Sequence, residues 1–229
     1  NGGLNSNGVF YIGRPPGSTI QQCGGNIDEV RITRGIGRYG VSAPAPTTPL
    51  TSTAGVVLLL SMNGAEGGTT FTDNSPSPKT PVTVAAGVVT TGAPAKFSQS
   101  GNFTGGYLQY ADSEDWNFGS GDFTVEFWAM FNSASPSARS IVFGQGGTNG
   151  ANDPVVLLKT TANTLQLAGT FVGGAAFSAT SVNAVYPNLW YYIACVRYGR
   201  LILLYVNGEV WAVTTSTLAL INSTSSFGV

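Results

Sequence analysis

Apolar and polar residues alternate along much of this chain with the two-residue period of β-strands. From Phe123 to Phe131 every second residue is apolar, beginning with Phe123 itself. Two apolar runs, Leu201–Val206 and Glu209–Val213, are separated by Asn207-Gly208, a strong hairpin signal because both turn residues need positive φ. Further strands are expected at Val9–Ile12, Ile27–Thr33, Val56–Asn63, Val82–Ala86, Tyr107–Tyr110, Ser140–Phe143, Val155–Lys159, Thr164–Leu167 and Trp190–Tyr198.

No segment shows a long helical period, and the strands are short, with turns rich in Gly, Asn and Ser. This pattern predicts an all-β chain folded as an antiparallel two-sheet sandwich of the jelly-roll type. We expect Phe123, Val125, Phe127, Ile193 and Leu203 to be buried. Cys195 lies in an apolar strand and is expected to be a buried free thiol.

A proline-rich segment interrupts the strand pattern near the start of the chain. Residues 40–49 contain three prolines and no charge, which favours extended, solvated chain. We therefore interpret residues 41–49 as a linker and residues 50–229 as the main jelly-roll domain. Residues 1–40 would supply closing strands of a preceding or permuted jelly-roll unit.

The segment Ile27–Thr33 needs a core that so short a piece cannot supply alone. Strict alternation would turn Val30 and Ile32 toward that core, with Asp28 on the same side. Three arrangements are open: the segment folds back onto residues 50–229, it pairs with a neighbouring subunit, or it belongs to a preceding domain.

Seven motifs follow one another in the main part of the chain: Leu58–Gly64, Thr70–Ser75, Tyr107–Tyr110, Asp115–Phe118, Gly121–Trp128, Trp190–Ala194 and Leu203–Gly208. In this order they resemble a concanavalin A-like, laminin-G-type jelly roll. The segment Gly25–Thr33 resembles the closing strand of that fold, which is normally C-terminal but comes first here. The resemblance implies a structural Ca²⁺ as the one candidate cofactor, and Asp28, Asn63 and Asp73 offer hard oxygen ligands for it.

The amino-acid sequences of two segments, Asp28–Gly35 and Phe71–Asp73, resemble segments of tailed-bacteriophage structural and adhesion proteins. This narrower resemblance implies a decoration or fibre protein on the virion surface. Its partners would be other virion subunits, including copies of itself in a homo-oligomer, with host-surface polysaccharide as a further candidate. The alternative is a carbohydrate-binding module of a secreted bacterial protein, acting outside the cell.

The composition of the chain excludes several classes of function. The 229 residues include 10 basic and 11 acidic side chains, a net charge of −1, and no His. A near-neutral chain lacks the excess of positive charge with which proteins bind the phosphates of nucleic acids. The longest clean apolar run, Val56–Leu60, is far shorter than the roughly 20 residues of a membrane-spanning helix. The absence of His excludes imidazole acid–base catalysis and imidazole metal sites.

The carboxylates do not form a recognisable catalytic pattern. Glycoside hydrolysis uses two facing carboxylates, and glucanases of this fold carry a Glu-x-Asp-x-x-Glu-like strand. That spacing does not occur here. Asp112, Glu114 and Asp115 cluster in a short segment that we interpret as a solvated turn. We therefore expect a protein that is not an enzyme.

Sugar binding would depend on aromatic side chains that stack on pyranose rings beside polar neighbours. Four aromatic residues are the candidates for such contacts: Tyr110, Trp116, Tyr198 and Trp211.

Overall fold

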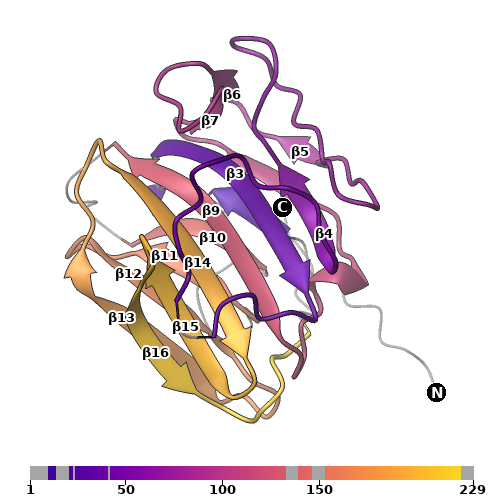
Figure 1. The fold of residues 1–229 in the computed structure, drawn as a ribbon, viewed down its shortest axis with the longest axis vertical. Helices are drawn as coiled ribbons and strands as arrows, with labels where there is room; N and C mark the ends of the chain where they lie inside the picture. Colours follow the sequence, from indigo (N-terminus) through magenta and orange to yellow (C-terminus); the bar gives the residue numbers. More distant parts are fainter. Residues whose placement is uncertain are drawn as a thin grey trace.

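The structure is a computed structural model that describes residues 10–13, 21–22, 24–40, 42–132, 139–145 and 153–222. Two twisted sheets face each other, as the strand pattern predicted (Figure 1). One 3₁₀ turn, η1 (Glu114–Trp116), is the only helical element among the described residues. In that same part of the chain no helix is long and apolar enough to cross a bilayer.

Sheet A has the strand order β13-β12-β11-β10-β1-β8-β5, and β2 pairs in parallel with β10. Its strands are β1 (Phe10–Gly13), β2 (Gln21–Gln22), β5 (Thr83–Val84), β8 (Tyr107–Tyr110), β10 (Ser140–Gln145), β11 (Val156–Lys159), β12 (Thr164–Thr170) and β13 (Ala176–Ala184).

Sheet B has the order β16-β15-β14-β9-β3-β7-β6, and β4 also pairs with β3. Its strands are β3 (Gly25–Arg34), β4 (Val56–Leu60), β6 (Val88–Thr91), β7 (Ser100–Phe103), β9 (Phe123–Phe131), β14 (Trp190–Tyr198), β15 (Leu201–Val206) and β16 (Glu209–Thr215). The predicted Asn-Gly hairpin joins β15 to β16, with φ of 52° at Asn207 and 98° at Gly208.

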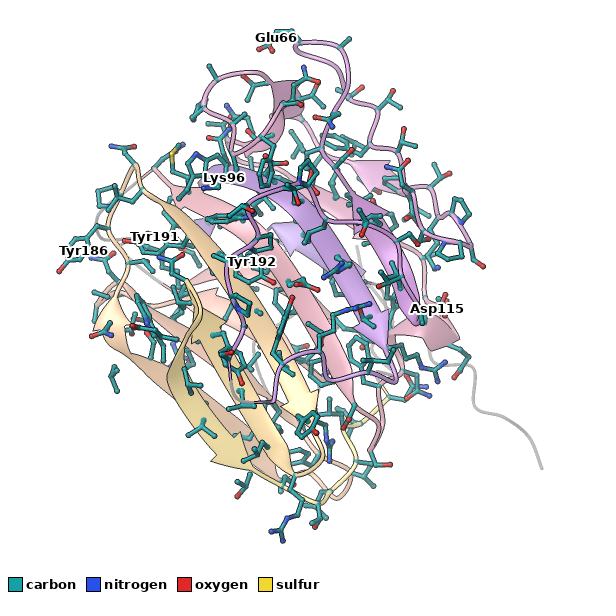
Figure 2. The ribbon with its side chains drawn as sticks, in the orientation of Figure 1. Glu66, Lys96, Asp115, Tyr186, Tyr191 and Tyr192 are labelled. Atoms are coloured by element: carbon teal, nitrogen blue, oxygen red, sulfur yellow. The ribbon has the colours of Figure 1, made fainter. Side chains whose placement is uncertain are left out.

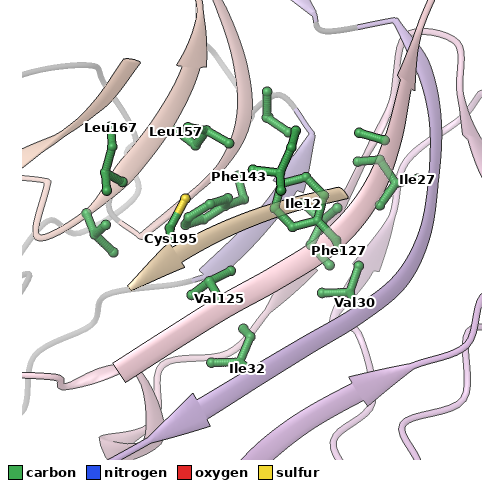
Figure 3. Close-up of a cluster of buried hydrophobic side chains, with 14 of the residues drawn as sticks. Ile12, Ile27, Val30, Ile32, Val125, Phe127, Phe143, Leu157, Leu167 and Cys195 are labelled. Carbon is green, nitrogen blue, oxygen red and sulfur yellow. The ribbon is translucent and has the colours of Figure 1, made fainter. Parts of the chain in front are cut away.

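The main core lies between the two sheets (Figure 3). Sheet A contributes Ile12, Phe143, Leu157 and Leu167, and sheet B contributes Ile27, Val30, Ile32, Val125, Phe127 and Cys195. Cys195 is the buried free thiol that the sequence predicted, whereas Cys23 lies outside the described residues. The expected core residues Phe123, Ile193 and Leu203 are also buried, although Leu203 packs on the outer face of sheet B.

Strand β3 is an interior strand of sheet B. It pairs with β9 along one side, and with β4 and β7 along the other. Residues 25–34 and the strands after residue 50 therefore share one sheet and one core. Of the three arrangements open to this segment, the structure adopts the fold-back within one chain.

A bulge within β3 changes which side chains reach the core. The register with β9 shifts between Asp28 and Arg31, and Glu29 has a φ of 53°. Ile27, Val30 and Ile32 consequently all enter the core, while Asp28 sits opposite Trp128 on the outer face. The expectation that Asp28 shares a side with Val30 and Ile32 was wrong, because strict alternation cannot anticipate a bulge.

The proline-rich segment covers the outer face of sheet B (Figure 1). We call residues 36–40 and 42–50 the strap. Ala43 of the strap is fully buried against a cluster that includes Trp128 and Tyr205. The Tyr205 hydroxyl donates to the Tyr39 carbonyl, and the Arg38 N–H donates to Thr124 Oγ1. The segment expected to be a solvated linker thus packs on the sheet as it leads from β3 to β4.

A buried carboxylate joins the strap to the strands beneath it. Glu126 on β9 accepts hydrogen bonds from Arg31 Nε at 2.7 Å, from the Tyr39 hydroxyl at 2.6 Å and from the Tyr192 hydroxyl. Arg38 Nε lies 3.7 Å from Glu126 Oε1. A fully buried carboxylate is tolerated only when cations and donors satisfy it in this way.

Replacing this carboxylate should destabilise the protein strongly. In Glu126→Gln the buried Arg31 guanidinium loses its counter-charge, so we expect the free energy of unfolding to fall by about 3–5 kcal/mol. Urea titration followed by tryptophan fluorescence measures it. The matched control, Glu209→Gln, alters an exposed residue and should change stability by less than about 0.5 kcal/mol. Equal effects of the two substitutions would contradict the network described above.

A second pair of variants tests whether β3 belongs to the core. Ile32 is fully buried and Ile36, four residues later, is 37% exposed. Ile32→Ala should cost about 2–5 kcal/mol because it leaves a cavity, and Ile36→Ala should cost far less. Urea unfolding of both variants measures the difference. A neutral Ile32→Ala would mean that residues 25–34 do not pack in this sandwich.

Candidate functional site

A groove with a mixed polar and apolar lining opens at the end of the sandwich where β3 ends and β4 begins. Its volume is about 650 Å³, within the range of about 300–1,000 Å³ that is usual for ligand sites. Asp115 lies at this end of the molecule (Figure 2). The lining residues are Arg34, Gly35, Gly55, Val56, Val57, Asp115, Asn117, Phe118, Gly119, Ser120, Gly121 and Asp122.

The charged groups of the groove are held by the surrounding fold. Asp115 Oδ2 forms an ion pair with Lys79 Nζ at 2.7 Å. Arg34 Nε donates to the Asn117 carbonyl at 3.2 Å, and Asp122 Oδ1 accepts from the Gly199 N–H at 2.8 Å. The groove therefore presents one cationic and two anionic side chains held in place, and the charge of one of the two aspartates is balanced by Lys79 outside the lining.

Trp116 anchors the segment that forms one wall of the groove. Ser113 caps η1 by accepting from the Asp115 N–H, and the Trp116 indole N–H donates to the Ala111 carbonyl. The Trp116 ring stacks on Phe10 with centroids 5.0 Å apart. Because this ring is locked in the core, its two neighbours, Asp115 and Asn117, are turned toward the groove.

Comparison with protein-family models matches residues 100–228 to the concanavalin A-like lectin/glucanases superfamily. The chain belongs to this superfamily. The match confirms the concanavalin A-like, laminin-G-type resemblance of the motifs from Tyr107 onward, and it agrees with the two antiparallel sheets. Searches of curated proteins and of solved structures found no match. The matched region begins at β7, so β3, which fills the middle of sheet B, precedes it in the chain.

Two of the four aromatic candidates in this concanavalin A-like domain cannot contact a sugar. Tyr110 and Trp116 are completely buried in the core, so the expectation that they stack on a ligand was wrong. The sequence shows that these residues are aromatic, but it does not show that the facing sheet covers them.

The other two aromatic candidates lie outside the groove lining and apart from each other in the sheet. Tyr198 is 49% exposed at the end of β14, beside Gly37 and Gly40 of the strap. Trp211 is half-buried on the edge strand β16, where it meets Tyr191 edge-on. The four predicted residues thus do not form one binding site.

The carboxylates proposed for Ca²⁺ serve other contacts. Asp73 accepts four hydrogen bonds, from the backbone N–H groups of Leu59, Ser75 and Lys79 and from the Ser75 hydroxyl. These donors occupy the lone pairs that a cation would need, so Asp73 does not fit a calcium site. Asn63 is exposed. In the described part of the chain, no group of three or more Asp, Glu, Cys or His side chains could hold a metal ion.

Asp28 and its neighbour Glu29 are buried on the bulge of β3. Asp28 Oδ2 accepts the backbone N–H groups of Lys96 and Phe97, and Glu29 Oε2 accepts the Leu50 N–H at the end of the strap. Burial raises the pKa of Asp28 to about 6 and that of Glu29 to about 7. These two carboxyls therefore hold loops onto sheet B and lie outside the groove lining.

Sequence reasoning missed the groove residues Arg34, Asn117, Ser120 and Asp122. The Gly119-Ser120-Gly121 turn between the buried Phe118 and Phe123 is a local signal for an exposed polar loop. Arg34, however, reaches this loop only because β3 pairs with β9. That convergence of distant segments leaves no trace in the local pattern.

The raised pKa values predict that the protein is more stable in mild acid. Both carboxyls bind protons more tightly in the folded state than in the unfolded state, so stability falls as the pH rises through about 6 to 7. We expect a higher melting temperature at about pH 5 than at about pH 8. Asp28→Asn should shrink this difference, and the control Glu209→Gln should preserve it. A wild-type melting temperature that increases between these two pH values would contradict the prediction.

Proposed function

We propose that this concanavalin A-like domain is a non-enzymatic binding domain that holds glycans in the groove. The observation that carries the proposal is a groove of about 650 Å³ lined by Arg34, Asp115 and Asp122, whose side chains are each held by a hydrogen bond or an ion pair. Arg34 and Ser120 supply donors, and Asp115 and Asp122 supply acceptors, which is the chemistry that sugar hydroxyls require. Groups already fixed by the fold lose little conformational freedom on binding.

The state of the carboxylates supports a binding role over hydrolysis. In the groove, Asp115 is paired with Lys79, and Asp122 accepts from the Gly199 backbone. A glycosidase instead needs one carboxyl kept protonated as an acid, facing a second carboxylate across the substrate. The carboxyls with raised pKa, Asp28 and Glu29, lie beneath the strap and the Lys96–Phe97 turn.

We place this domain on the virion surface of a tailed bacteriophage, as a decoration or fibre protein that binds other subunits. The phage-like sequence of Asp28–Gly35 supports a place on a virion, and so does the low share of charged residues, 9%. Residues 28–34 of that segment belong to β3, and Arg34 and Gly35 at its end line the groove.

Removing the exposed guanidinium of the groove should weaken glycan binding. On a glycan array, we expect the full-length protein to bind at least one oligosaccharide and Arg34→Ala to lose that signal. Titration calorimetry should then give an affinity at least about tenfold lower, the equivalent of about 1.4 kcal/mol. Arg139→Ala, which removes an exposed arginine outside the groove, is the matched control.

Three results would contradict the proposal. The first is a wild-type protein that binds no glycan on the array, and the second is equal binding by Arg34→Ala and the wild type. The third is cleavage of a bound oligosaccharide, detected by mass spectrometry after prolonged incubation.

A further inference from the structure

A second, smaller cavity lies at the end of sheet B where β14 turns into β15 and where β16 ends (Figure 1). We call it the hydroxyl cup, and its lining residues are Arg200, Thr215, Ser216 and Thr217. Its volume is about 200 Å³, below the roughly 300 Å³ at which sites for whole small molecules begin. The cup is therefore suited to one functional group of a larger ligand.

The lining of the cup is rich in hydrogen-bond donors and contains no carboxylate. Ser216 Oγ accepts the Leu218 N–H at 3.0 Å, so the hydroxyl hydrogen of Ser216 is left to donate. Thr215 and Thr217 add two exposed hydroxyls. The exposed Arg200 guanidinium forms no hydrogen bond or ion pair with the residues that the structure describes. These donors are available to a ligand that can accept.

The free guanidinium distinguishes Arg200 from the arginines that hold the fold together. Four described arginines donate hydrogen bonds to the protein itself: Arg31, Arg34, Arg38 and Arg197. A guanidinium that the fold does not use, placed in a cavity, is the group with which proteins commonly bind oxyanions.

A buried arginine beneath the cup adds a second positive charge. Arg197 is 1% exposed, and its Nη2 donates to the Ser216 carbonyl at 3.4 Å and to the Leu218 carbonyl at 2.9 Å. Its Nη1 donates to the Gly119 carbonyl of the groove at 3.1 Å. These partners are neutral, and Arg197 forms no ion pair within the described part of the chain. Its charge therefore acts on the cup without a contacting counter-ion.

The chain around the cup carries little negative charge to balance the two arginines. In the sequence from Leu201 to Val229 the one charged residue is Glu209, which follows β15 and lies roughly 20 Å from Arg200. Asp122 attracts Arg197, but its Oδ1 accepts the Gly199 N–H and its side chain lines the groove rather than the cup. The remaining positive charge favours an anion in the cup.

We propose that the hydroxyl cup binds an oxyanion and that the domain thereby selects glycans that carry an acidic group. The Arg200 guanidinium offers two parallel N–H donors to a carboxylate, sulfate or phosphate, and the hydroxyls supply further donors. The cup and the groove meet at one turn, because Gly199 binds Asp122 of the groove and Arg200 follows it. The inference rests on the proposed function, since the acidic sugar in the cup and the sugars in the groove are parts of one glycan.

Nuclear magnetic resonance titration of the nitrogen-15-labelled, full-length protein tests the cup directly. The acidic probes are methyl β-glucuronide, glucose 6-sulfate and glucose 6-phosphate, and methyl β-glucoside is the neutral match of the first. We expect at least one acidic probe to shift the amide resonances of Arg200 and of residues 215–217. The neutral glucoside should leave these resonances unchanged. The acidic probe with the highest affinity identifies the oxyanion that the cup prefers.

Substitutions of Arg200 test whether its guanidinium holds the probe. Arg200→Ala should weaken binding of that probe by about tenfold or more, because the charge and both donors are lost. Arg200→Lys keeps the charge but not the paired donors, so its affinity should lie between those of Arg200→Ala and the wild type. The matched control is Arg139→Ala, an exposed arginine that lines neither the cup nor the groove and should bind as the wild type does. Unchanged resonances elsewhere in the spectrum show that each variant is folded.

Three results would overturn the inference: no acidic probe shifts the resonances of the cup, the neutral glucoside shifts them equally, or Arg200→Ala binds as the wild type does. Failure of the groove is seen separately. Arg34→Ala should lower the affinity for a glycan found on the array and leave the probe shifts at the cup intact. A cup that binds the acidic probes in a protein that binds no glycan on the array would contradict the proposed function alone.

Discussion

The pairing of β3 within sheet B is the interaction on which the rest of the structure depends. Because β3 lies between β9 on one side and β4 and β7 on the other, it joins the start of the chain to the region that matches the concanavalin A-like superfamily. The pairing completes the core with Ile27, Val30 and Ile32. Without β3, the inner edges of β9 and β4 would be open to water or to other chains.

The same pairing sets up both the outer face of sheet B and the groove. Leaving β3, the chain returns across the sheet as the strap, and Arg31 and Tyr39 meet at the buried Glu126 carboxylate. The end of β3 brings Arg34 to the Asn117 carbonyl beside the 119–121 turn. One early segment therefore supplies core side chains, the buried ion pair and part of the candidate binding site.

The sequence allowed the fold class to be predicted because alternation and turn residues act locally. It predicted the Asn207-Gly208 hairpin, the burial of Phe127 and the need of the apolar side chains in Ile27–Thr33 for a core. It did not predict β13, whose small polar residues give a weak strand pattern at a sheet edge. The exposure of aromatic residues, the bulge at Glu29 and the convergence of groove residues depend on tertiary packing, which a local pattern does not encode.

Native-state hydrogen exchange of the full-length protein tests the central role of β3 most directly. If β3 is an interior strand, its inner amides exchange only through global unfolding, with the same free energy as the amides of β9 and β14. We expect this shared value for the amides of Ile27, Val30 and Ile32. Exchange of these amides at a much lower free energy, independent of β9, would contradict it.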